Sequence, residues 1–184
     1  MDQPELPAPF AALAELAGEP TVERAQSLGR ALKAVPDLAA WIREQRRLTV
    51  RALLDMPEHS AKTLSGPLGV IPQRVHDIAG GHRASEVAAP ELPAVFADLA
   101  GLAGEPSVER ARSLGEAVKA APGLTAWIRS RRQRSVRALL DMPQHSAATL
   151  SGPLGVTPQR VRDVAAGHRA PENRRRAAAR AAIG

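Results

Sequence analysis

The residues best suited to catalysis form a short group that occurs twice. Asp55, His59 and Ser60 lie within six positions of one another. The same three residue types recur 86 positions later, at Asp141, His145 and Ser146. Aspartate, histidine and serine are the side chains of a hydrolytic triad, in which the histidine takes the proton of the serine nucleophile. No nucleophile-elbow pattern surrounds these residues, and triad members need not be close in sequence. We therefore expect no catalytic residues and no enzyme.

Metal and cofactor chemistry is equally poorly supported by the sequence. The chain has no cysteine and five histidines, namely His59, His76, His82, His145 and His168. None of them forms the His-x-x-x-His spacing that places two ligands on one helical face. No glycine-rich phosphate loop is present either. We expect neither a metal site nor a cofactor.

Positive charge is the most prominent chemical feature. The net charge is +6, with a pI near 11.1. Residues 6–84 carry ten basic and eight acidic groups, whereas residues 92–170 carry eleven and six. A basic surface attracts polyanions, chiefly nucleic acid. Charge alone leaves open a second interpretation, a solvated helical protein that is rich in arginine.

Composition indicates how these groups are held. Hydrophobic residues make up 44% of the chain and aromatic residues only 2%, so the core must be aliphatic, which favours packed helices. We expect an all-α fold in which Phe10, Phe96, Trp41 and Trp127 are core anchors rather than base-stacking side chains. No stretch approaches 18 apolar residues and the N-terminus is acidic, so we expect a cytoplasmic protein without a membrane partner.

An internal repeat sets the domain organisation. Shifting the chain by 86 residues aligns positions 6–84 with 92–170, and 58 of these 79 positions are identical. A period of this length suits a small domain rather than a solenoid unit. The sequence predicts two homologous helical-bundle domains, residues 1–84 and 92–170, with a linker at 85–91 and a basic tail at 171–184.

Each repeat is expected to begin with several amphipathic helices. In the first repeat these are a helix at 7–17, a second helix from residue 22 that stops at Pro36, and a third that starts there. Thr49, like Ser135 in the second repeat, is expected to cap a further short helix. Gly29 falls inside the second helix, where it costs about 1 kcal/mol relative to alanine, so close helix packing is expected there.

Each repeat ends in a pair of short helices. The stretch 61–80 predicts a first helix capped by Ser60, a break at Gly69, and a second helix with Pro72 in its first turn. Residues 147–166 repeat the pattern. Pro67 is unusual late in the first helix, because it removes a hydrogen bond, so that helix is expected to start late, at Ser65, or to be distorted.

This pair resembles the helix-turn-helix of bacterial DNA-binding proteins. The features that match are Ser65 and Ser151 four positions before the turn glycine, the glycine itself, and the string Gly-Val-x-Pro-Gln-Arg-Val-x-Asp. With the arginine-rich segment before it, the pair also looks like the promoter-reading region of sigma factors. The resemblance covers about 20 residues of each repeat, or about 40 with that segment.

The resemblance implies which residues would contact DNA. In such proteins the second helix enters the major groove, where glutamine pairs with adenine and arginine with guanine. Aspartate would accept from cytosine or orient a neighbouring arginine. The expected base contacts are Gln73, Arg74, His76, Asp77, Thr157, Gln159, Arg160, Arg162 and Asp163. The expected phosphate contacts are Arg43, Arg46, Arg47, Arg51, Arg83, Arg129, Arg131, Arg132, Arg134, Arg137 and Arg169.

The function expected from this resemblance is sequence-specific binding of double-stranded DNA, in transcription regulation or nucleoid organisation. The alternative is an adaptor whose duplicated N-terminal helices contact RNA polymerase or another transcription protein. The second repeat is expected to dominate DNA affinity. It is more basic, and Thr157 can cap the second helix of its pair whereas Ile71 cannot.

Overall fold

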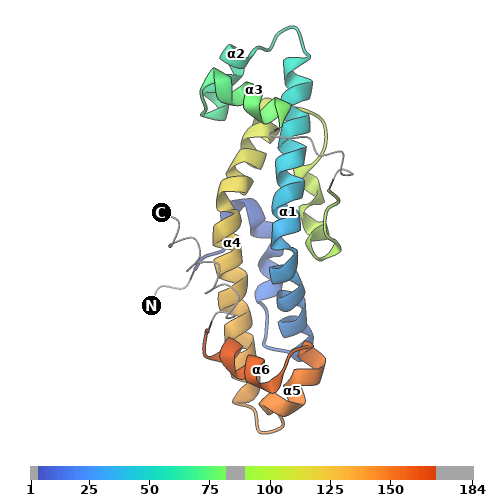
Figure 1. The fold of residues 1–184 in the computed structure, drawn as a ribbon, viewed down its shortest axis with the longest axis vertical. Coiled ribbons are helices and arrows are strands. Elements are labelled where there is room, and N and C mark those ends of the chain that lie inside the picture. Colours follow the sequence, from blue (N-terminus) through green and yellow to red (C-terminus); the bar gives the residue numbers. More distant parts are fainter. Residues whose placement is uncertain (1–3, 82–89, 169–184) are drawn as a thin grey trace, which may run out of the picture. The chain divides into compact units, whose positions relative to one another are not determined.

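The computed structural model describes residues 4–81 and 90–168, and all regular elements in these residues are helices (Figure 1). The first repeat contains η1 (Ala8–Ala17), α1 (Val22–Leu54), α2 (Ala61–Leu68) and α3 (Pro72–Gly80). The second contains η2 (Ala94–Leu102), α4 (Val108–Leu140), α5 (Ala147–Leu154) and α6 (Pro158–Ala165). The all-α prediction is confirmed. No helix of the described residues combines the length and apolar character needed to cross a membrane.

The N-terminal segment of each repeat is wound more tightly than expected. η1 and η2 are 3₁₀ helices rather than amphipathic α-helices, and each is interrupted at its phenylalanine. Phe10 has φ −113° and ψ 20°, and Phe96 has nearly the same values. Both rings are fully buried, and Trp41 and Trp127 are buried as well. The prediction that the four large aromatic residues are core anchors is confirmed.

The expected boundary at Pro36 is wrong, because α1 runs unbroken for 33 residues with Pro36 inside it. A proline inside a helix removes one backbone hydrogen bond and costs about 3 kcal/mol. Burial of Leu38 and Ile42 on the following turns offsets that cost. Thr49 does not cap a new helix either. Its hydroxyl donates to the Gln45 carbonyl at 2.8 Å within α1, and its side chain is buried.

The described residues form two compact units, and neither coincides with a repeat. One unit, here called the first-motif unit, contains residues 5–14 and 33–125, including α2 and α3. The described part of the other, the second-motif unit, is residues 4, 15–32 and 126–168, including α5 and α6. Each unit thus combines the C-terminal part of one long helix with the N-terminal part of the other. The expected domains, residues 1–84 and 92–170, stay a prediction.

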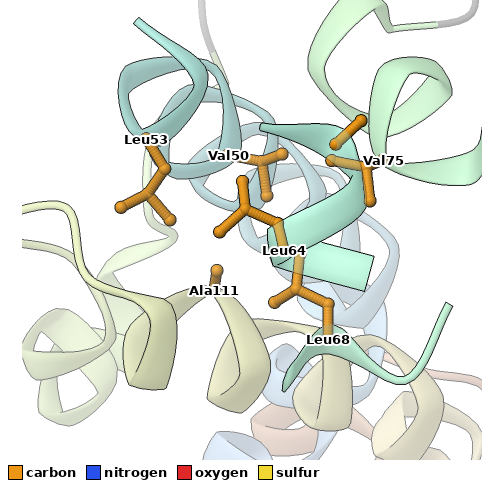
Figure 2. Close-up of a cluster of buried hydrophobic side chains, with 7 residues drawn as sticks. Val50, Leu53, Leu64, Leu68, Val75 and Ala111 are labelled. Carbon is orange, nitrogen blue, oxygen red and sulfur yellow. The ribbon is translucent and has the colours of Figure 1, made fainter. Parts of the chain in front are cut away.

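The apolar cores give the physical reason for this division. In the first-motif unit, Val50, Leu64 and Val75 pack together with Ala111 of α4, which belongs to the other repeat (Figure 2). In the second-motif unit, the equivalent cluster around Val161 includes Ala25 of α1. Ala25 and Ala111 are both fully buried. Each short helix pair therefore completes its core with a helix face from the opposite repeat.

Candidate nucleic-acid interface

Local interactions fix the geometry of each short helix pair. Ser60 accepts a hydrogen bond from the Thr63 amide at 3.2 Å, and the Thr63 hydroxyl oxygen accepts one from the Ser60 amide at 2.8 Å. The expected cap at Ser60 is confirmed, and the late start at Ser65 is wrong because α2 begins at Ala61. Gly69 ends α2 with φ 62°, a left-handed conformation that favours glycine. Ser146 and Gly155 repeat this arrangement.

The second helix of each pair presents polar side chains to solvent around one buried anchor. Val75 anchors α3 and Val161 anchors α6, and both are fully buried. The expected base-contact residues are exposed at Gln73, Arg74, His76, Thr157, Gln159 and Arg162, and half-buried at Asp77, Arg160 and Asp163. The structure thus brings each predicted set together on one short helix.

The aspartate organises its neighbours on both helices. In α6, Gln159 donates to one Asp163 oxygen at 3.0 Å, and Arg160 lies 4.0 Å from the other. In α3, Gln73 and Arg74 have the same relation to Asp77, at 3.3 and 3.7 Å. These contacts match the expectation that the aspartate orients a neighbouring arginine. Arg162 also donates to the side-chain amide oxygen Oε1 of Gln159, at 3.5 Å.

The two helix starts differ as the sequence predicted. Thr157 accepts a hydrogen bond from the Arg160 amide at 3.2 Å, so α6 has a side-chain cap. Ile71 provides none, and its side chain is 69% exposed. The backbone at the two positions is nearly identical, with φ −73° and ψ 154° at Ile71 and φ −69° and ψ 155° at Thr157. The difference between the helix starts therefore comes from the side chain alone.

The arginines expected to contact phosphate lie in different surroundings. Three are exposed on the long helices, namely Arg43, Arg51 and Arg137. Arg47 is paired with Glu44 through contacts of 2.8 and 2.6 Å, and this hydrogen bond lowers the pKa of the Glu44 carboxyl. Arg131 lies over the Trp127 ring, 5.6 Å from its centroid. Arg129, like Arg134, is half-buried, whereas Arg83 and Arg169 lie outside the described residues.

Arg46 and Arg132 occupy positions that sequence reasoning did not anticipate. The Arg46 guanidinium packs against Gly115 of α4, and the Arg132 guanidinium packs against Gly29 of α1. The expected close packing at Gly29 is thus present, and its partner is an arginine of the other repeat. The only sequence feature that pointed to these arginine positions was the presence of a glycine inside each long helix. Arg46 and Gly115 are 69 positions apart, so spacing could not have paired them.

Other chemistry finds little support among the described residues. No group of three or more histidine, aspartate or glutamate side chains could hold a metal ion there. The Ser60 and Ser146 hydroxyls, which the sequence offered as nucleophiles, cap helices instead. Comparisons with protein-family models, with curated proteins and with solved structures found no match to this chain.

Proposed function

We propose that the protein binds double-stranded DNA through the exposed faces of α3 and α6. The observation that carries this proposal is the twofold occurrence of one arrangement. Each helix holds a glutamine and an arginine against one aspartate, next to a buried valine that packs the helix onto its unit. Ordered amide and guanidinium donors on an exposed helix are the groups that read adenine and guanine in the major groove.

The long helices supply charge beside these faces. Arg51 in the last turn of α1 and Arg137 in the last turn of α4 are exposed, and each belongs to the unit that contains the nearest helix pair in sequence. Exposed arginines that flank a recognition helix contact phosphates and fix its register on the duplex. Transcription regulation or nucleoid organisation is the role that such binding would serve.

Selection of bound sequences from a random duplex pool, followed by anisotropy titrations at several salt concentrations, tests this function. DNA binding predicts a steep salt dependence, with a slope of about 0.9 per phosphate contacted. Gln159→Ala should weaken binding to the selected site by about 1–3 kcal/mol and relax the preference at one base pair. Arg137→Ala should weaken all sequences alike and reduce the slope by about one.

Arg30→Ala is the matched control, since it removes the same charge from an exposed position on α1 outside both helix pairs. It should change affinity much less than Arg137→Ala. A protein that binds no duplex at low salt, or an Arg30→Ala variant as weak as Arg137→Ala, would refute the proposed interface.

A protein partner for the first motif is the second candidate. Ile71, at the start of α3, is the most exposed large hydrophobic side chain of the described residues, and the second repeat has Thr157 there. If α3 served a transcription protein rather than DNA, Gln73→Ala would leave DNA affinity unchanged while Gln159→Ala reduced it. Equal losses from the two substitutions would assign both helices to DNA.

A further inference from the structure

Two glycines inside the long helices make room for arginine side chains. A Cβ at Gly115 would lie 3.0 Å from both Cζ and Nη2 of Arg46, and a Cβ at Gly29 would lie 3.3 Å from Cζ of Arg132. Both separations are shorter than ordinary van der Waals contact. Because glycine costs about 1 kcal/mol relative to alanine inside a helix, each repeat gives up helix stability where the guanidinium is seated.

These two guanidinium groups have no counter-charge among the described residues. Arg46 and Arg132 are half-buried, and the Nε atom of each is buried without a hydrogen-bond partner. Among the described residues no carboxylate lies within 4.0 Å of either group, although Arg47 next in sequence is paired with Glu44. A cation that is removed from water and left unpaired is costly, so each position that keeps one is suited to an external anion.

A second arginine adjoins the same apolar cluster as each seated guanidinium. Arg46 is one turn before Val50, Gly115 is one turn after Ala111, and Arg74 adjoins Val75. Val50, Val75 and Ala111 all pack in one cluster (Figure 2), so each of the other three residues follows or precedes a member of that cluster on its own helix. In the second-motif unit, Arg132 is one turn before Val136, Gly29 is one turn after Ala25, and Arg160 adjoins Val161. Val136, Ala25 and Val161 likewise pack in one cluster.

The pKa shifts of Arg46 and Arg132 agree with a second arginine near each of them. Burial lowers the pKa of Arg46, and the positive charge of Arg74 lowers it further. Burial and the charge of Arg160 lower the pKa of Arg132 in the same way. The contacts of Arg74 and Arg160 with their aspartates, 3.7 and 4.0 Å, are longer than the about 2.8 Å of a charge-assisted hydrogen bond. Arg160 Nη1 also donates to the His168 carbonyl at 3.3 Å, and the other N–H groups of the two guanidinium groups remain for an added ligand.

We propose that Arg46 with Arg74, and Arg132 with Arg160, form two equivalent sites that each bind one phosphate group. The tetrahedral oxyanion accepts from both guanidinium groups and neutralises the repulsion between them. The phosphate is supplied either by the DNA backbone, in which case the inference rests on the proposed function, or by free inorganic phosphate. Arg74 and Arg160 then hold the register of α3 and α6 on a duplex rather than specify a base.

The first experiment measures binding of inorganic phosphate by the full chain. The melting temperature is compared in phosphate and in chloride at equal ionic strength, for the wild type and for Arg46→Met, Arg132→Met and the double variant. Methionine replaces the seated side chain with an unbranched apolar one, so it should preserve or raise stability in chloride. Phosphate should raise the melting temperature of the wild type, less that of each single variant, and not that of the double variant. Arg30→Met, at an exposed position on α1 outside the expected DNA contacts, is the control and should respond like the wild type.

The second experiment measures affinity for the selected duplex and for an unrelated one. Arg132→Met should weaken both about tenfold and reduce the salt slope by about one, whereas Arg30→Met should have a smaller effect. Arg160→Ala should also weaken both duplexes by equal factors. Arg132→Lys keeps the charge and the fold but loses the planar fork, so its affinity should lie between those of the wild type and Arg132→Met.

The outcomes separate this inference from the proposed function. Stabilisation by phosphate without DNA binding would support the sites, assign them to free phosphate and refute the proposed function. A uniform loss of DNA affinity without stabilisation by phosphate would support them as backbone contacts. If DNA binds and Arg132→Met equals Arg30→Met in both assays, the sites are refuted while DNA binding stands. A loss confined to one base pair in Arg160→Ala would make Arg160 a base contact and refute its pairing with Arg132.

Discussion

Exchanging Ile71 and Thr157 between the repeats isolates the contribution of one helix cap. Thr157 accepts a hydrogen bond from the Arg160 amide at 3.2 Å, and Ile71 cannot accept one. Because the two backbones are nearly superimposable in φ and ψ, a threonine at 71 should place its oxygen as Thr157 does. Ile71→Thr also removes an exposed hydrophobic side chain at no cost in buried area. We expect Ile71→Thr to stabilise the protein and Thr157→Ile to destabilise it.

The expected magnitudes differ slightly between the two changes. Loss of a threonine cap costs about 1 kcal/mol, so Thr157→Ile should lower the free energy of unfolding by that amount. In the first repeat the Arg74 amide already donates to the Ile71 carbonyl at 2.9 Å, so the gain from Ile71→Thr should be smaller, about 0.5–1 kcal/mol. In a chain of 184 residues, 1 kcal/mol corresponds to about 2–4 °C in melting temperature.

Urea unfolding measures the change in global stability, and amide hydrogen exchange measures the change in local opening at the helix start. Exchange at the Arg160 amide should become roughly fivefold faster in Thr157→Ile, the factor that corresponds to 1 kcal/mol, if this helix start opens locally. Thr157→Ser keeps the hydroxyl and should differ little from the wild type. The reasoning fails if Thr157→Ser is as unstable as Thr157→Ile, or if Ile71→Thr gives no gain in stability.

Three further perturbations test the fold. Ser60→Ala and Ser146→Ala each remove one half of a capping box and should cost about 1 kcal/mol in urea unfolding, and equal costs would show that the two motifs are built alike. Leu64→Ala should cost about 2–5 kcal/mol, because it leaves a cavity in a cluster that a helix of the other repeat completes. Glu44→Gln should flatten the pH dependence of stability. Hydrogen bonding to Arg47 lowers the folded pKa of Glu44, so its contribution is present above the unfolded pKa of about 4.3 and is lost as pH falls through the folded value. The stability difference between wild type and Glu44→Gln should therefore narrow below about pH 4, and a difference independent of pH would contradict the assignment.

Features that depend on near neighbours in the chain could be predicted from the sequence alone. Ser60 as a cap, Gly69 as a left-handed turn, and Thr157 as a cap that Ile71 lacks each involve residues only a few positions apart. The burial of Val75 and of the aromatic residues followed from helical periodicity, because one face of each helix must leave water. The choice of an all-α fold followed from composition, because a core with so few aromatic residues must be aliphatic.

Tertiary packing decided the features that join distant residues. The residues around Pro36 predict a helix boundary. The helix α1 nevertheless continues through Pro36, because the apolar side chains before and after it are buried along one helix face. The membership of Ala111 in the core of the first motif, and the seating of Arg46 against Gly115, join residues more than 30 positions apart. Because 58 of the 79 aligned positions are identical, the sequence does not show whether an apolar helix face packs on its own repeat or on the other one. Only the packed structure shows that each helix pair is completed by the opposite repeat, and that this places an unpaired guanidinium beside each of the two motifs.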